Sequence, residues 1–462
     1  MKRNHLMVTL LFLSVSTLLT SCNLMPSTPG QYQENPYCRT NMNVLYDTPY
    51  PTVAQIKPVQ PYLKDDDGSL TSDGLNYVYP FDTNLLYIRY ASDYLPSYKE
   101  VMKIESLTGK YTVECHQLFD RHYYYLDENN RMINNLKVIN DSYGTGEWIN
   151  VDKRLIEVLK MSKEMTEFSK GKYNLFIGEL STYWNYYLLV NDFMGDPSES
   201  IDPAHSEEEK NKLNQMVINT PKWDEIDDVL VLDEVNNRVK FNKYYPNGSL
   251  ISADKVSITL GGIGKGYLSE NLYLRLKENN LTKGLVYSGS SSLVFMDKNV
   301  TQNAWKISLS NPYYYLENYV GILNINEKLS LSTSGSQVQR YTTIVDDKVV
   351  LRQHIIDPTT GYPSSYYPQI TLLSKTISST VMDTLSTILI NCSLDEIPQM
   401  IKNINETYGD LGCIFYECDL SLTQEKRSIK LYVSRSLKDS GMFEEYVPTT
   451  SSYIPVTYEY ME

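Results

Sequence analysis

The sequence has little cysteine and very little histidine. It contains six cysteines and five histidines in 462 residues. Cys22 lies near the start, and the other five form no CxxC pair, so we expect at most one disulfide and at least one free thiol. A zinc site needs closely spaced ligands, which these residues do not supply. The five are Cys38, Cys115, Cys392, Cys413 and Cys418.

Positive charge is also scarce, since the formal net charge is −14 and no basic run follows the initial MKR. Nonspecific binding of nucleic acid relies on Lys and Arg contacts to phosphates. The acidic net charge therefore argues against a nonspecific nucleic-acid-binding protein. The chain is 42% hydrophobic. Its length and composition therefore favour a globular protein of one large domain or two to three ordinary ones.

Long apolar runs are missing as well. Residues 6–20 are mostly apolar, but they are too short to span a bilayer. They follow Lys2 and Arg3 and precede LTSC, a pattern typical of a secretory signal that resembles a bacterial lipobox. We expect a signal peptide over 1–21 and a lipid on Cys22 that anchors the protein to the membrane. An ordinary signal peptide with an incidental cysteine is the alternative.

The rest of the chain mixes helical and strand patterns. Residues 22–74 are rich in Pro, Ser, Asn and Asp and are interpreted as a tether, and a strand is expected within 78–90. Helices are predicted over 97–126 and 153–170, and a hairpin over 229–241 turns at Asn236-Asn237. The charged segment 198–224 shows no clear core face and is interpreted as a surface insertion. The alternation predicts a mixed α/β fold.

A glycine cluster follows the β-branched run VSITL. The segment VSITLGGIGKGY, 256–267, predicts a strand, a glycine turn and the start of a helix. This geometry lets backbone N–H groups approach a phosphate, and Lys265 can add a charge there. The spacing matches neither the dinucleotide fingerprint nor the Walker pattern. A tight turn that needs a positive φ at Gly261 or Gly262 is the alternative.

Three further stretches carry polar side chains that could contribute to a functional site. STSG, 332–335, follows a strand, and HIIDPTTG, 354–361, presents a histidine before an Asp-Pro turn. A helix from about Ser379 carries Asp383 and Thr387 four residues apart, hence on one face. A hard cation accepts such oxygen ligands. Taken separately, the STSG stretch favours a polar loop, and the helix from about Ser379 favours a capped helix that packs a threonine.

Taken together, the order and spacing of these stretches resemble the ApbE family, the FAD:protein FMN transferases of bacterial envelopes. The family's motifs correspond to LGGIGKGY at 260–267, STSG, HIIDPTTG and MDTLST at 382–387. The resemblance covers roughly residues 75–445, leaves 446–462 as a C-terminal tail, and implies a mixed α/β domain of the family's T-fold type. It also suits a lipoprotein on the extracytoplasmic face of a bacterial membrane.

The resemblance implies an enzyme that uses FAD and Mg²⁺, transfers FMN to a Ser or Thr hydroxyl of another protein, and releases AMP. The metal ligands would be the Gly262 carbonyl, Asp383 and Thr387, and His354 would be the general base. Asp357 would order the turn. The residues expected to border the flavin nucleotide are Lys172, Tyr173, Asn174, Thr259, Lys265 and Ile356.

The sequence departs from the family pattern at three places. Thr259 stands where the family has an acid, Asn174 where it has an aspartate, and SGSSS at 288–292 where it has LGGN. Because the metal pair and the histidine are intact, we favour retained chemistry. Two alternatives remain, an FAD pyrophosphatase that releases FMN and AMP, and a non-catalytic flavin-binding lipoprotein. The chain has no flavinylation site of its own, so the acceptor is expected to be another envelope protein.

Overall fold

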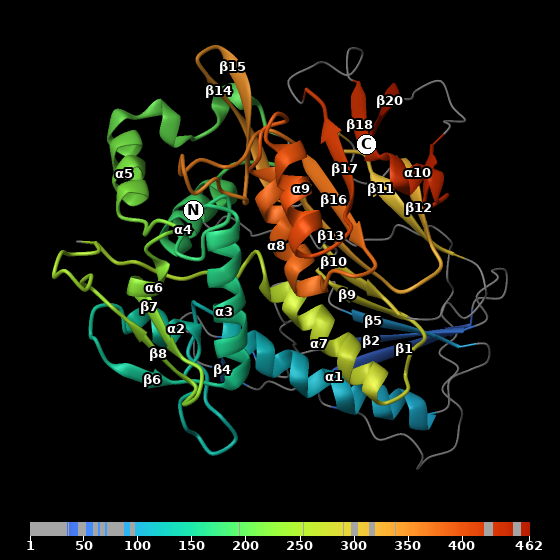
Figure 1. Ribbon diagram of the computed structural model, residues 1–462, viewed down its shortest axis with the longest axis horizontal. Coiled ribbons are helices and arrows are strands. Elements are labelled where there is room, and N and C mark those ends of the chain that lie inside the picture. Colours follow the sequence, from blue (N-terminus) through green and yellow to red (C-terminus); the bar gives the residue numbers. More distant parts are fainter. Residues whose placement is uncertain are drawn as a thin grey trace, which may run out of the picture.

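The computed structural model describes most of the chain (Figure 1). The described residues are 35, 37–44, 52–58, 63–64, 70–71, 87–92, 98–193, 195–252, 254–289, 291–296, 304–313, 319–337, 339–419, 428–446 and 454–462. The predicted signal peptide and the lipidation site Cys22 lie outside this part of the chain. Within it, no helix combines the length and the apolar character needed to cross a membrane.

A ten-stranded sheet forms the centre of the protein, with the strand order β1-β2-β5-β9-β10-β13-β16-β17-β18-β20. Neighbouring strands are antiparallel except β18 and β20, which run parallel. The strands are β1 (Cys38–Val44), β2 (Thr52–Pro58), β5 (Tyr87–Ser92), β9 (Leu285–Ser288), β10 (Ser292–Phe295), β13 (Leu329–Gly335), β16 (Gln369–Ser374), β17 (Gly412–Glu417), β18 (Ile429–Ser434) and β20 (Val456–Met461).

Helices cover one face of this sheet, and a smaller sheet covers the other (Figure 1). The alternation of side chains along a strand explains this division. In β10, Val294 packs beneath the helices, whereas Leu293 and Phe295 face the smaller sheet. The helices are α1 (Tyr98–Phe119), α7 (Gly264–Glu278), α8 (Ser379–Ile390) and α9 (Ile397–Thr407), and the opposite layer contains β11 (Trp305–Ser310), β12 (Tyr319–Ile325), β19 (Phe443–Glu445) and α10 (Arg435–Asp439).

A second lobe beside the helices contains the predicted hairpin and the second predicted helix. Asn237 adopts a φ of +48° at the hairpin turn, and Gly171 adopts +86° just after the helix, so both predictions are confirmed. The elements of this lobe are α2 (Leu136–Asp141), β6 (Trp148–Asn150), α3 (Lys153–Phe168), α4 (Gly178–Val190), α6 (Ile226–Val229), β7 (Leu230–Asp233) and β8 (Arg238–Phe241).

The structure differs from the sequence interpretation at both ends of the domain. The predicted tether, 22–74, contains β1 and β2 of the large sheet and the short pair β3 (Leu63–Lys64) and β4 (Leu70–Thr71). The predicted tail, 446–462, contains β20, which pairs with β18. Strands that join a sheet edge gain their stability from partners far away in the sequence, so their own composition gives only a weak signal.

Candidate active site

The glycine cluster follows an irregular segment rather than the predicted strand. Only Ser257 forms a strand-like bridge, with Ile177. The neighbouring Ile258 is held by a side chain instead, because the Asn140 amide donates to its carbonyl at 3.0 Å and accepts from its N–H at 2.7 Å. Thr259 closes the turn by accepting from the Gly261 N–H at 3.3 Å. The expected strand is therefore wrong, but the chain still enters α7 through the glycines.

Gly262 lies against the face of α8 that carries Thr387. A Cβ atom at Gly262 would lie 3.1 Å from Thr387 Oγ1 and 3.1 Å from Tyr173 Cε2. The close approach explains why a residue without a side chain occupies this position. The structure thus places Gly262 beside Thr387, as expected of two members of one metal site.

Asp383, the third predicted ligand, is buried at the N-terminus of α7. Its Oδ2 accepts from the Gly266 N–H at 2.9 Å and its Oδ1 accepts from the Ser292 hydroxyl at 2.7 Å. No Lys or Arg of the described chain forms an ion pair with this carboxylate. A buried carboxylate without a cationic partner is costly, and a bound cation would compensate it.

The donor set fits a hard cation such as Mg²⁺. It consists of one carboxylate, one hydroxyl and a backbone carbonyl, all oxygen ligands. Within the described residues no group of three or more His, Cys, Asp and Glu side chains could hold a metal, so softer nitrogen and sulfur sites find no support there.

His354 stands exposed on the surface while protein atoms surround it in most directions. Desolvation and the charge of Lys265 lower the pKa of His354 to about 4, and the backbone of Gln339 opposes them. The imidazole is therefore neutral at pH 7 and able to accept a proton.

The turn after His354 is closed by hydrogen bonds, and Asp357 orders it as expected. Asp357 accepts from the Thr359 N–H at 2.8 Å, and Gly361 adopts a φ of +72°. The Trp184 indole donates to the Gly361 carbonyl at 2.6 Å. Asn391, at the end of α8, donates to the carbonyls of Ile356 and Lys172 at 3.1 and 3.0 Å. Asn391 therefore joins the histidine turn to the predicted nucleotide-binding segment, a role that its sequence position gave no reason to expect.

The predicted nucleotide neighbours 172–174 bind protein groups. Lys172 forms an ion pair with Glu396 at 2.9 Å, and the hydroxyl of the buried Tyr173 donates to Ser162 at 3.2 Å. Asn174 donates to the Pro221 carbonyl at 2.8 Å. An aspartate could not donate this bond, which gives a physical reason for asparagine here.

Lys265 and Gly266 link His354 and Asp383 to the start of helix α7. Lys265 acts electrostatically on His354, and the next residue, Gly266, donates to Asp383. Both belong to the first turn of α7, where the helix dipole favours an anion. The histidine, the metal pair and a phosphate-attracting helix end thus converge at one place.

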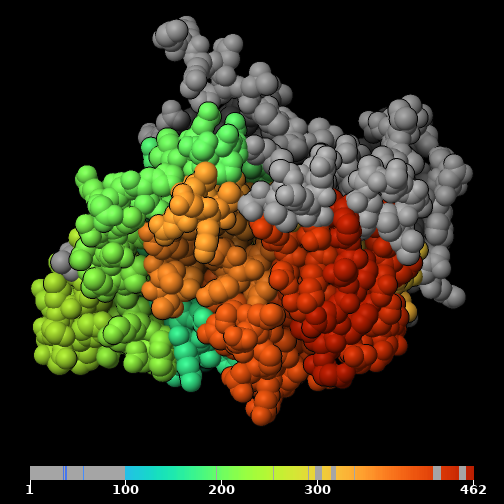
Figure 2. Space-filling view, turned by 90° about the horizontal axis from the view of Figure 1, so that it is seen from above, coloured from blue at the N-terminus to red at the C-terminus, as the bar shows by residue number. Residues whose placement is uncertain are grey.

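The segment 198–224 covers the histidine turn. It contains two 3₁₀ turns, η2 (Pro197–Glu199) and η3 (Pro203–His205), and helix α5 (Glu207–Ile218), and it lies beside the hairpin of β14 (Arg340–Val345) and β15 (Lys348–Gln353). Figure 2 shows this green segment against the orange hairpin. The segment does have a core face, since Leu213 is fully buried and Val217 packs on Gly361.

A buried ion pair fastens this segment to the hairpin. Asp202 accepts from Arg352 Nε at 2.9 Å and from the Tyr341 hydroxyl at 2.8 Å. Burial raises the pKa of Asp202, but the bonds from Arg352 and the other donors outweigh it and hold the pKa below its ordinary value.

Replacing Asp202 by alanine would leave Arg352 buried without its carboxylate. We expect the free energy of unfolding to fall by about 3–5 kcal/mol. Urea unfolding of the variant measures this loss. Glu199→Ala, an exposed change in the same segment, should stay within about 0.5 kcal/mol of the unmodified protein. If the two changes lowered the free energy of unfolding equally, the Asp202–Arg352 ion pair would not be the stabilising contact.

Replacing Lys265 by methionine would remove the positive charge that acts on His354. The pKa of His354 should then rise from about 4 toward 6.5, while the contribution of desolvation remains. In the protein without nucleotide, an NMR titration of the imidazole should show a higher midpoint, whereas the exposed Lys402→Met control should not move it. An unchanged midpoint in Lys265→Met would show that Lys265 does not act on the histidine.

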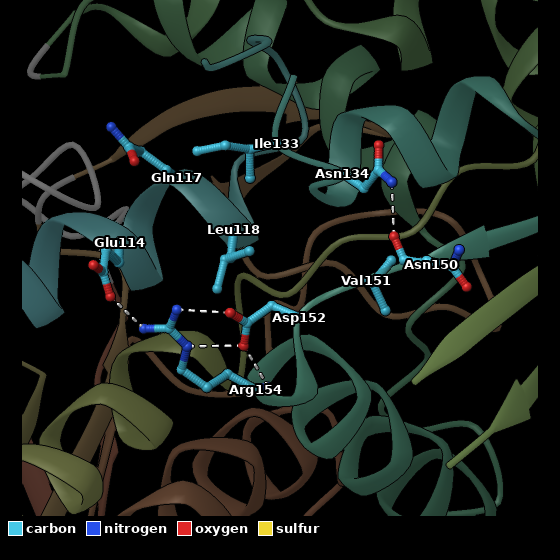
Figure 3. A pocket seen from close by; sticks show the side chains of 9 residues that line it. All are labelled: Glu114, Gln117, Leu118, Ile133, Asn134, Asn150, Val151, Asp152 and Arg154. Carbon is cyan, nitrogen blue, oxygen red and sulfur yellow. Dashed lines mark hydrogen bonds and ion pairs between the residues drawn. The ribbon is translucent and has the colours of Figure 1, made fainter. Parts of the chain in front are cut away.

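A cavity of the described chain lies elsewhere, between α1, the segment just before α2, β6 and the start of α3 (Figure 3). It has a volume of about 300 Å³ and is lined by Arg154 among others. The guanidinium of Arg154 already binds Asp152 at 2.8 and 2.9 Å and Glu114 at 2.8 Å. With its cation neutralised in this way, the cavity offers no free charge to a phosphate.

Comparison with known proteins gives a family match that spans both the site and this cavity. A family model described as the ApbE family matches residues 104–413. The chain belongs to the ApbE family. The match includes the glycine segment, the histidine turn and the Asp383–Thr387 pair, so the resemblance inferred from the sequence is confirmed.

Individual ApbE relatives are distant. An FAD:protein FMN transferase of Klebsiella pneumoniae (strain 342) is 29% identical over 108 residues, which is 23% of this chain and 30% of that relative. The ApbE protein of Thermotoga maritima has a TM-score of 0.53 at 18% identity, covering 78% of this chain and 96% of its own. The flavin transferase ApbE of Vibrio cholerae has a TM-score of 0.51 at 16% identity, covering 87% and 99%. These structures show that the predicted mixed α/β fold of the ApbE family is present.

Proposed function

We propose that this protein transfers FMN from FAD to a Ser or Thr hydroxyl of another protein. The observation that carries the proposal is the convergence of three features: the neutral His354, the N-terminus of α7, and the Asp383 carboxylate, which has no cationic partner among the described residues. Membership of the ApbE family and the name of the Klebsiella relative support it.

In this reaction the acceptor hydroxyl attacks the FMN phosphorus of FAD, and the bond from that phosphorus to the AMP oxygen breaks. His354 takes the hydroxyl proton as general base, and AMP leaves. Lys265, in the first turn of α7, binds and orients the diphosphate with its positive charge. Gly262, Asp383 and Thr387 would hold Mg²⁺, which supplies charge neutralisation on the phosphate oxygens when bound.

We also propose that a lipid on Cys22 anchors the protein to the extracytoplasmic face of a bacterial membrane. The pattern LTSC after a short apolar segment supports this. The acceptor would then be an envelope protein within reach of the tethered domain. Metabolic labelling with a clickable fatty acid should mark the protein, and Cys22→Ala should remove the label.

The activity is tested by incubating the purified protein with FAD and Mg²⁺, with and without an acceptor fragment that carries a D-x-x-S/T-G-A-T flavinylation motif. We expect AMP release that requires Mg²⁺ and the acceptor, together with flavin fluorescence on the acceptor in a denaturing gel. AMP and FMN release without labelling would favour the FAD pyrophosphatase. Bound FAD without any AMP would favour a flavin-binding lipoprotein.

A further inference from the structure

A cluster of buried serines lies between the helices and the large sheet, close to Asp383. Ser292, the first residue of β10, is fully buried and donates its hydroxyl to Asp383 Oδ1 at 2.7 Å. Its cross-strand neighbours are Ser288 on β9 and Ser332 on β13. The SGSSS segment, a departure from the family pattern, therefore brings a hydroxyl to the predicted metal ligand.

The other serines of the cluster make different bonds. Ser269 and Ser288 share a hydrogen bond at 2.6 Å, and Ser269 also donates to the Ser292 carbonyl at 3.2 Å. These bonds hold the backbone around the start of β10. Ser386 donates to the Asp383 carbonyl rather than to its carboxylate. Among the described residues only Ser292 contributes a side-chain donor to the Asp383 carboxylate.

Two donors from separate elements therefore fix the orientation of this carboxylate. Gly266 holds Oδ2 from α7, and Ser292 holds Oδ1 from β10. Each oxygen keeps a further lone-pair site, because a carboxylate oxygen can accept more than one bond. We propose that Ser292 is a positioning residue that presents Asp383 to the divalent cation. The proposal rests on the proposed function, since it assigns Asp383 to the metal.

Removing the Ser292 hydroxyl would leave Oδ1 without its donor and let the carboxylate turn about its last side-chain bond. Loss of a partner that orients a metal ligand typically weakens metal binding by about 10- to 100-fold. A purely structural serine would change stability without this loss of metal affinity. Metal affinity, rather than turnover, therefore separates the two roles.

The test is a Mn²⁺ titration of the purified protein with saturating FAD and no acceptor, in which electron paramagnetic resonance measures free Mn²⁺. Ser292→Ala should bind Mn²⁺ about 10- to 100-fold more weakly than the unmodified protein. Ser330→Ala is the matched control. Ser330 lies on β13, is equally buried, and its hydroxyl has no hydrogen-bond partner among the described residues. Thermal unfolding of both variants reports any change in stability.

Unchanged Mn²⁺ affinity in Ser292→Ala would overturn the proposal even if the variant unfolds at a lower temperature. An equal loss in Ser330→Ala would also overturn it, since affinity would then follow core packing. If the unmodified protein binds no Mn²⁺, the metal dependence of the proposed function fails along with this inference. If it binds Mn²⁺ and only Ser292→Ala binds weakly, the positioning role is supported whatever the acceptor turns out to be.

Discussion

His354→Ala should lower the rate of AMP release from FAD by about 10²- to 10⁴-fold, because the acceptor hydroxyl loses the group that takes its proton. FAD binding should persist, since the helix end and Lys265 remain. Stopped-time assays with saturating FAD measure the rate, and flavin fluorescence measures binding.

Thr359→Ala serves as the control for this change. Thr359 lies in the same turn and is exposed, and its backbone N–H, which the change keeps, makes the bond to Asp357. The rate of AMP release by Thr359→Ala should therefore stay close to that of the unmodified protein. A His354→Ala variant that releases AMP at the unmodified rate would remove His354 from the mechanism.

Loss of a residue that supports a metal ligand typically lowers metal affinity by about 10- to 100-fold. Asp383→Asn should lower it by at least as much, because it removes the one charged ligand. The amide would also turn its NH₂ group toward one of two donors, the Gly266 N–H or the Ser292 hydroxyl. Isothermal titration with Mn²⁺ in the presence of FAD measures the affinity.

Asp395→Asn provides the comparison for that variant. Asp395 is an exposed carboxylate just after α8, so its loss should leave Mn²⁺ binding unchanged. If Asp383→Asn bound Mn²⁺ as tightly as the unmodified protein, the cation would have to lie at another place in the molecule.

Local patterns made much of the site predictable. The four-residue spacing of Asp383 and Thr387 required one helix face, and the structure places both in α8. The Asp-Pro-Thr-Thr-Gly sequence required a tight turn, and Asp357 and Gly361 form it. In each case the determining interactions lie within a few residues of one another.

Interactions between distant segments were not predictable. Ser292 and Asp383 are 91 positions apart, and Asn391 and Lys172 are 219 apart. The alternation in LSLS, 329–332, indicated a strand, but not that its serine face would be buried against α8, where Ser332 meets Ser386 at 3.1 Å. Buried polar pairs of this kind depend on how the elements pack, which a single sequence does not show.

The most direct test of the account is the intact mass of the acceptor fragment after incubation with the protein, FAD and Mg²⁺. The account predicts a mass increase equal to FMN less one water, localised to the Ser or Thr of the flavinylation motif and absent with His354→Ala. An acceptor of unchanged mass beside stoichiometric FMN and AMP would show that water, and not a protein hydroxyl, is the group that attacks FAD.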